Sequence, residues 1–168
     1  MRTDRLELRL PAEADRNRFV ELFADEAFMA FSGGTLDEAA GNERFDAMVR
    51  RTLEFDYAKQ CVIERSTGTI LGYSGIDKLT WEGAEHLEYG YRLIPSARGK
   101  GYATEAGLAI LAHADAQYRD SGTPGEVYAV IDPTNLPSQN VAGKLGFVFE
   151  KQAIVQGFLD NLYTRQLG

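Results

Sequence analysis

The sequence has few of the residues that build disulfides and metal sites. Its 168 residues include one cysteine, Cys61, and two histidines, His86 and His113. A single cysteine excludes an internal disulfide, and so few cysteine and histidine ligands leave no cluster with metal-site spacing. Cys61 stands in an apolar, strand-like run, which favours a buried and unreactive thiol. We therefore expect a domain that folds without a metal or a disulfide.

Positive charge and long apolar runs are also scarce. The chain has 18 Lys and Arg against 25 Asp and Glu, a formal net charge of −7. This balance argues against general nucleic-acid binding, which needs a basic face, and is compatible with cationic substrates such as amines. No N-terminal segment resembles a signal peptide, and no run is long enough to cross a membrane. A cytoplasmic protein with no nucleic-acid or membrane partner is the default expectation.

What the chain does contain is enough apolar material for one core. Hydrophobic residues make up 44% and charged residues 26% of the sequence, which is ordinary for a water-soluble domain. A chain of this length buries roughly 70% of its unfolded surface on folding. No linker, low-complexity tract or internal repeat divides it, so residues 1–168 are predicted to form a single domain.

Hydrophobic periodicity predicts alternating strands and helices. Alternating or continuous apolar runs predict strands at 5–10, 61–63, 70–73, 86–94, 126–131, 147–155 and 162–167. Apolar residues at helical spacing predict helices at 12–24, 36–57, 101–119 and 135–145. Thr35 and Glu38 would form a capping box on the second helix, and a loop is expected at 122–125. The crossover 86–131 would give one parallel pair in an otherwise antiparallel sheet.

The most informative stretch is Arg98-Gly99-Lys100-Gly101-Tyr102-Ala103, between a predicted strand and a predicted helix. The first amides of a helix have no intrahelical partner, and the helix dipole places partial positive charge there. Glycines let a phosphate approach the backbone, and Arg98 and Lys100 add full charges. The stretch therefore predicts a pyrophosphate site.

Two nucleotide fingerprints fit this stretch poorly. A dinucleotide site needs G-x-G-x-x-G, but here Thr104 occupies the place of the third glycine. A Walker loop, G-x-x-x-x-G-K-[ST], is found nowhere in the chain. A nucleotide-binding domain thus stays a weaker alternative, and a basic, glycine-rich loop that caps a helix without binding a ligand stays another.

A third match is to an acetyltransferase motif. Arg98, Gly101 and Ala103 fit motif A, [QR]-x-x-G-x-[GA], of the GCN5-related N-acetyltransferase (GNAT) superfamily, which the chain resembles along residues 1 to 167. Residues 1–9 and 12–15 look like the start of the branch that includes ribosomal-protein N-terminal acetyltransferases, and residues 102–106 look like the continuation of its coenzyme loop. The same branch has an N-x-x-S…K-L-G-F motif. In this chain it is resembled by Asn135-Leu136-Pro137-Ser138, followed by Lys144-Leu145-Gly146-Phe147.

The resemblance implies the GNAT fold and its chemistry. The fold would be a mixed α/β domain whose twisted, mostly antiparallel sheet has about seven strands, one parallel pair and a splay, with four helices around it. Acetyl-CoA would be the co-substrate and a primary amine, either a protein N-terminus or a small molecule, the acceptor. Transfer would be direct, in a ternary complex. A non-catalytic acyl-CoA-binding or regulatory module is the alternative, and the protein would be a monomer or a homodimer.

The coenzyme would be held mainly by backbone groups. Beside Arg98, the pyrophosphate would be bound by the amides of Gly99, Lys100, Gly101, Tyr102, Ala103 and Thr104. The resemblance implies that the pantetheine arm pairs with backbone near Leu93 and Ile94, in a splay between strands 86–94 and 126–131. Gly90 would carry the bulge that opens this splay, and an amide at residues 90–92 would face the thioester carbonyl.

Glu88 is the candidate general base. It lies on the central strand beside Leu87 and Tyr89, where a carboxylate is costly without a partner and where burial would raise its pKa. It would remove a proton from the incoming ammonium group. A solvent-facing or ion-paired Glu88 is the alternative, and His86 is the runner-up base. Tyr89 and Tyr91 are expected to form groove walls.

Asn135 and Ser138 begin the fourth predicted helix. The Asn135 side chain is expected to accept from the Ser138 amide as an N-cap. The resemblance adds a contact of Asn135 with the pantetheine or its surroundings. The Ser138 hydroxyl would donate a proton to the leaving thiolate or serve only as a second cap. Many GNAT enzymes use a tyrosine as this acid, at a position where this chain has Ala142.

Overall fold

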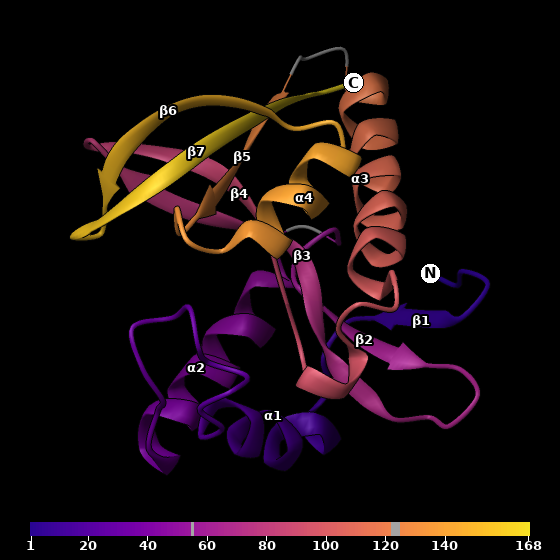
Figure 1. The fold of residues 1–168 in the computed structure, drawn as a ribbon. Helices are drawn as coiled ribbons and strands as arrows, with labels where there is room; N and C mark the ends of the chain where they lie inside the picture. Colours follow the sequence, from indigo (N-terminus) through magenta and orange to yellow (C-terminus); the bar gives the residue numbers. More distant parts are fainter. Residues whose placement is uncertain (55, 122–124) are drawn as a thin grey trace.

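The computed structural model describes residues 1–54, 56–121 and 125–168, which form one seven-stranded sheet (Figure 1). The strands are β1 (Leu6–Arg9), β2 (Gln60–Glu64), β3 (Ile70–Trp81), β4 (Ala84–Leu93), β5 (Gly125–Ile131), β6 (Val148–Val155) and β7 (Phe158–Leu167). Their order across the sheet is β1-β2-β3-β4-β5-β7-β6. Within the described residues, β4 and β5 form the one parallel pair of neighbouring strands.

Four α-helices accompany the sheet within the same residues. They are α1 (Arg16–Phe23), α2 (Glu38–Arg51), α3 (Tyr102–Ser121) and α4 (Leu136–Lys144), with 3₁₀ turns at Glu13–Asp15 and Pro95–Ala97. The predicted order of strands and helices is confirmed. The loop expected at 122–125 falls outside the described residues except for Gly125, which begins β5. None of the described helices combines the length and apolarity that crossing a membrane requires.

The second helix differs from its prediction at both ends. The capping box of Thr35 and Glu38 is wrong, because α2 begins at Glu38 and Asp37 is its N-cap, accepting from the Ala40 amide at 2.8 Å. The helix also ends at Arg51 rather than at residue 57. Ala58 instead forms an isolated parallel bridge with Ile76 of β3, in which the Ile76 amide donates to the Tyr57 carbonyl at 3.0 Å. Because backbone groups that pair with a strand cannot also make helical hydrogen bonds, the helix ends before this bridge.

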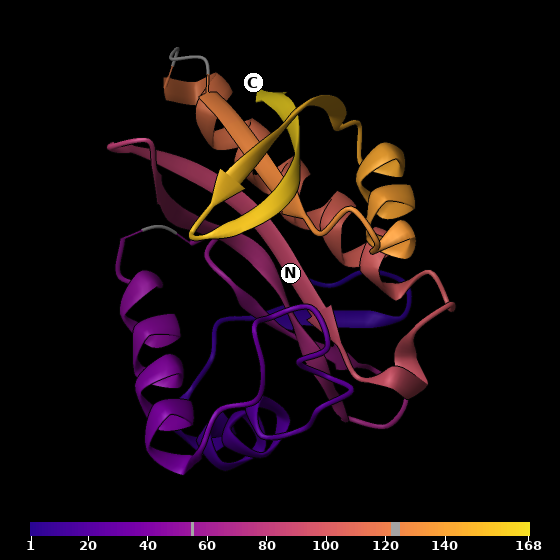
Figure 2. The ribbon, with the colours of Figure 1, turned by 60° about the vertical axis from the view of Figure 1, so that its left-hand side comes forward.

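Two apolar layers enclose the sheet. Phe19 of α1 and Phe45 of α2 pack with Tyr73 on one face, whereas Ile110 of α3 packs with Val127 in the core of the other. Figures 1 and 2 show α1 and α2 together, away from α3 and α4. Cys61 is fully buried in the first layer, as predicted, and burial raises the pKa of its thiol to about 12, which disfavours the reactive thiolate.

The splay between β4 and β5 is present but has another cause than the one expected. The two strands pair only where Leu87 and Glu88 meet Val127 and Tyr128. The predicted bulge at Gly90 is wrong, because β4 pairs with β3 from Leu93 to Ala84 without a shift in register. Each strand instead keeps its longer hydrogen-bonded pairing: β4 pairs with β3 from Ala84 to Leu93, while β5 pairs with β7 over its whole length. The gap opens where those two ladders diverge.

Candidate functional site

The loop before α3 has the backbone that the anion site requires. Gly99 and Gly101 have φ angles of +73° and +82°, a region that favours glycine. The first helical bond is donated by the Glu105 amide to the Gly101 carbonyl at 3.0 Å. In the described part of the chain, no group accepts a hydrogen bond from the backbone amides of residues 99–104. Six donors at a helix start are thus available to an anion.

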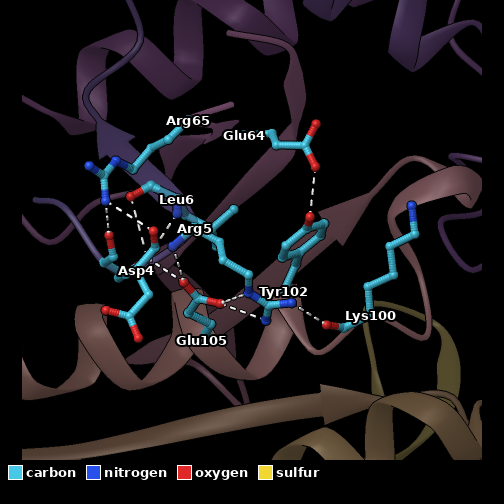
Figure 3. Close-up of polar contacts among 9 residues, drawn as sticks. Asp4, Arg5, Leu6, Glu64, Arg65, Lys100, Tyr102 and Glu105 are labelled. Atoms are coloured by element: carbon cyan, nitrogen blue, oxygen red, sulfur yellow. Dashed lines mark hydrogen bonds and ion pairs between the residues drawn. The ribbon is translucent and has the colours of Figure 1, made fainter. Parts of the chain in front are cut away.

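A cluster of side chains ties the start of β1 to this loop (Figure 3). The Arg5 guanidinium donates to Glu105 Oε2 at 2.7 Å and to the Lys100 carbonyl at 2.8 Å, and it lies 4.5 Å from the centre of the Tyr102 ring. The Tyr102 hydroxyl donates to Glu64 of β2 at 2.6 Å. These contacts hold the loop against two strands. In the same view the Lys100 side chain extends away from Arg5.

Glu105 would repel an anion if its charge were not compensated. The Thr3 hydroxyl and the Arg5 amide also donate to its carboxylate, at 2.6 and 2.9 Å. Burial acts to raise the pKa of Glu105, but the hydrogen bonds from Thr3 and Arg5 outweigh it, and the pKa is lowered. The ionised carboxylate is therefore paired with Arg5, and the partial positive charge of the helix start stays available.

A pocket of about 510 Å³ adjoins the loop. It lies between the start of β1, the first turns of α3 and the end of α4, and is lined by Asp4, Arg5, Gly101, Thr104, Glu105, Leu108 and Lys144. Lys144 belongs to the K-L-G-F segment that the sequence analysis singled out. The pocket therefore brings together two motifs about 40 residues apart in the sequence.

Arg98 is engaged within the protein. Its guanidinium donates to the Leu93 carbonyl at 3.1 Å and to the Ala27 carbonyl at 2.5 Å. It thereby joins the end of β4 to the loop between α1 and α2. The expected contact of its side chain with a pyrophosphate stays a prediction and would require an exchange of these partners.

Backbone groups on one edge of β4 face the splay. The Ile94 amide donates to the Leu71 carbonyl of β3 at 2.8 Å, and the Ile94 carbonyl accepts from the Ala97 amide at 3.0 Å. Because successive residues alternate their backbone groups, the amides of Tyr91 and Leu93 point toward the β5 side. Of the two residues expected to pair with a pantetheine arm, Leu93 turns its amide toward the splay, although its carbonyl already accepts from Arg98 at 3.1 Å, whereas both backbone groups of Ile94 are bonded internally.

The start of α4 faces this splay. The Asn135 side chain accepts from the Ser138 amide at 3.2 Å, which confirms the predicted N-cap. The Ser138 hydroxyl lies 3.1 Å from the Tyr91 hydroxyl of β4. Ala142, one turn further along α4, is buried. A serine and a tyrosine from two elements therefore form one hydroxyl pair.

Glu88 lies on the opposite face of β4 from Tyr91, together with its cross-strand neighbour Asp77. It is half-buried, and burial raises its pKa as predicted, while the charge of Lys59 opposes the rise. Lys59 Nζ lies 3.2 Å from Asp77 Oδ2. A Cβ atom at Gly90 would be 3.8 Å from both Glu88 Oε1 and Lys59 Cε, so the missing side chain leaves room for this charged group.

The geometry gives little support to His86 as a base or to a metal site. The His86 ring packs between Trp81 and Tyr128, with ring centres 5.6 and 5.2 Å away. This places it beside the β3–β4 hairpin end rather than at the splay. Among the residues that the structure describes, no three His, Cys, Asp or Glu side chains gather closely enough to hold a metal ion.

Sequence reasoning missed several members of the site. Arg5 alternates with apolar residues in the predicted strand 5–10, so its side chain is expected only to be exposed to solvent. Lys59 lies in a connecting segment that carries no motif. Tyr91 is expected to be only a groove wall, yet its hydroxyl meets Ser138. The one local signal available was Glu105, an acidic side chain in the first turn of a predicted anion-binding helix, which needs a cation nearby.

Comparisons with known proteins agree with this geometry. A family model for the acetyltransferase (GNAT) domain matches residues 5–148. The protein YkkB of Bacillus subtilis (strain 168) is 30% identical over 152 residues, which cover 89% of this chain and 85% of YkkB. The crystal structure of the acetyltransferase from Agrobacterium tumefaciens str. C58 is 25% identical with a TM-score of 0.82, covering 98% of this chain and 92% of that one.

The fold is shared with an enzyme solved with coenzyme A. RimL, a ribosomal L7/L12 alpha-N-protein acetyltransferase, aligns with a TM-score of 0.78 and 15% identity over 98% of this chain and 96% of that one. The family model spans the unpartnered amides and the Ser138 turn, and the resemblance carried by the motifs is confirmed. The chain therefore belongs to the GNAT acetyltransferase family.

Proposed function

We propose that this protein transfers an acetyl group from acetyl-CoA to a primary amine, either a protein N-terminus or a small molecule. The observation that carries the proposal is the set of unpartnered amides at residues 99–104, which opens α3 beside the splay. They suit the pyrophosphate of the donor. The coenzyme A bound to RimL, a structure of the same fold, supports this choice of ligand. We expect the enzyme to act in the cytoplasm, as a monomer or a homodimer.

The free edge of β4 would position the acyl group. The Leu93 amide would pair with the pantetheine arm, and the Tyr91 amide would donate to the thioester carbonyl as negative charge develops there. Asn135 would stand at the same opening as the cap of α4. Because the strands separate after Glu88, an extended donor can lie in the gap without breaking the sheet.

The two proton transfers would occur on opposite faces of β4. Glu88 would take a proton from the ammonium group of the acceptor, on the face covered by α1 and α2. Ser138 would give a proton to the departing thiolate, on the face of α4. The raised pKa of Glu88 brings its basicity closer to that of the amine, which favours proton removal.

The proposal is tested by thiol release from acetyl-CoA in the presence of a panel of peptides with free N-termini and small primary amines. We expect turnover with at least one acceptor and none above background when the acceptor is omitted. Coenzyme A binding without turnover on any acceptor would favour the alternative, a non-catalytic acyl-CoA-binding module. Binding of NAD or ATP in competition with coenzyme A would favour a nucleotide-binding domain.

The pairing of Arg5 with Glu105 predicts an effect on donor affinity. Arg5→Gln should weaken coenzyme A binding about fivefold, because Glu105 would keep an uncompensated negative charge beside the phosphates. The double variant Arg5→Gln/Glu105→Gln should recover most of the loss. Titration calorimetry at low and high salt measures both effects, and the loss should shrink as salt rises. Equal affinities of the single variant and the wild type would contradict this account.

A further inference from the structure

We propose that Tyr91 is a positioning residue for the acid step: it orients the Ser138 hydroxyl toward the coenzyme thiol and replaces the proton that Ser138 gives up. The inference rests on the proposed acetyl transfer. Its basis is the 3.1 Å contact between the two hydroxyl groups, which joins β4 to the first turn of α4 at the edge of the splay.

Both partners are held in place by packing. The Tyr91 ring lies 6.3 Å from the Tyr89 ring, which in turn packs against Phe147 at 5.8 Å. The Ser138 backbone is fixed by its hydrogen bond to Asn135. Ala142, one turn further along α4, is buried and carries no hydroxyl. Tyr91 therefore supplies, from a strand, the phenol that this helix lacks.

The direction of the hydrogen bond follows from what the reaction needs. If the Tyr91 hydroxyl donates to Ser138 Oγ, the Ser138 proton is free to point at the sulfur. Burial raises the pKa of Tyr91, although the hydrogen bond with Ser138 and the positive charge of Arg98 both act to lower it. The phenol thus keeps its proton at neutral pH and can serve as the donor.

The acid step moves two protons along the hydroxyl pair. When the carbon–sulfur bond of the thioester breaks, the sulfur keeps the electron pair and takes the proton of Ser138 Oγ. The Ser138 oxygen takes the proton of the Tyr91 hydroxyl at the same time. The carbon–nitrogen bond forms as the amine attacks, and the nitrogen gives up two protons in all: one to Glu88 before the attack and one to water as the carbon–sulfur bond breaks. One of these two protons, relayed by water, restores the Tyr91 hydroxyl, and the other stays in solvent. No oxidant or reductant is involved.

The first test compares hydroxyl deletions at matched positions. Tyr91→Phe and Ser138→Ala should each lower kcat about tenfold to a hundredfold with little change in the KM for acetyl-CoA. The double variant should lose no more than Ser138→Ala alone, because the two hydroxyls act in series. Tyr128→Phe is the control: its hydroxyl donates to the exposed Glu126 carboxylate of the same strand, β5, at 2.8 Å, and its removal should leave kcat unchanged.

A second test needs no acceptor and separates this inference from the proposed function. The pH dependence of alkylation of bound coenzyme A by iodoacetamide reports the pKa of its thiol. A hydroxyl pair aimed at the sulfur stabilises the thiolate, so Tyr91→Phe and Ser138→Ala should raise that pKa by about one unit relative to the wild type and Tyr128→Phe. An unchanged thiol pKa in Tyr91→Phe would overturn the inference, whether or not the wild type turns over.

Discussion

Replacing Gly101 by valine should lower the affinity for coenzyme A by at least about a hundredfold, the equivalent of losing two charge-assisted hydrogen bonds. Two physical effects combine at this position. The φ angle of +82° is strained for any β-branched residue, and the side chain would stand among the amides that are expected to bind phosphate. Its Cβ atom would already lie 3.4 Å from Arg5 Nη2.

The matched control for this variant is Gly68→Val. Gly68 has a φ angle of +70° and open space around its Cβ position, and it lies in the turn between β2 and β3. The substitution should impose a similar backbone strain without touching the donor site. Titration calorimetry with coenzyme A should show normal affinity for this control. If the Gly101 variant is folded and binds as tightly as the wild type, the amides of residues 99–104 are not the pyrophosphate site.

Replacing Glu88 by glutamine should lower kcat at neutral pH by at least about a hundredfold, the usual contribution of a general base. The amide keeps the shape of the side chain but cannot accept the proton of the ammonium group. Donor affinity should change little, because Glu88 faces α1 and α2 while the donor would lie along the free edge of β4. Steady-state kinetics with a saturating acceptor separates the two effects.

The role of Glu88 as a base also predicts how kcat depends on pH. A base works only when deprotonated, so wild-type kcat should fall as the pH drops through the raised pKa of Glu88, above the ordinary range of a glutamate. The variant should lack this acidic limb. Glu85→Gln is the control, because Glu85 lies on the same strand but pairs with Lys78 at the surface, and it should behave as the wild type. A wild-type profile for Glu88→Gln would exclude Glu88 as the base.

Local patterns in the sequence were sufficient for the architecture. The periods of apolar residues predicted the order of strands and helices and the parallel crossover, because burial on one face constrains every second or every third to fourth residue. The motif around Gly101 predicted a backbone with positive φ angles, since only glycine adopts that region without strain. The Asn135 cap followed from a contact three residues away.

Other predictions failed where distant segments compete for the same backbone. The predicted second helix extends six residues past its actual end at Arg51, because no local sequence feature near residue 57 indicates that this segment pairs with β3. The bulge at Gly90 was wrong for a related reason. Whether a splay comes from an extra residue or from diverging ladders depends on which neighbours each strand holds.

By itself the sequence determined the fold class, the family and the loop whose amides remain free, because each depends on residues within a few positions of one another. Only the tertiary structure decided which side chains meet: Arg5 with Glu105, Lys59 with Asp77 beside Glu88, and Tyr91 with Ser138. Members of these pairs lie 18 to 100 residues apart. Their contacts arise from strand register and helix docking, which a local pattern does not encode.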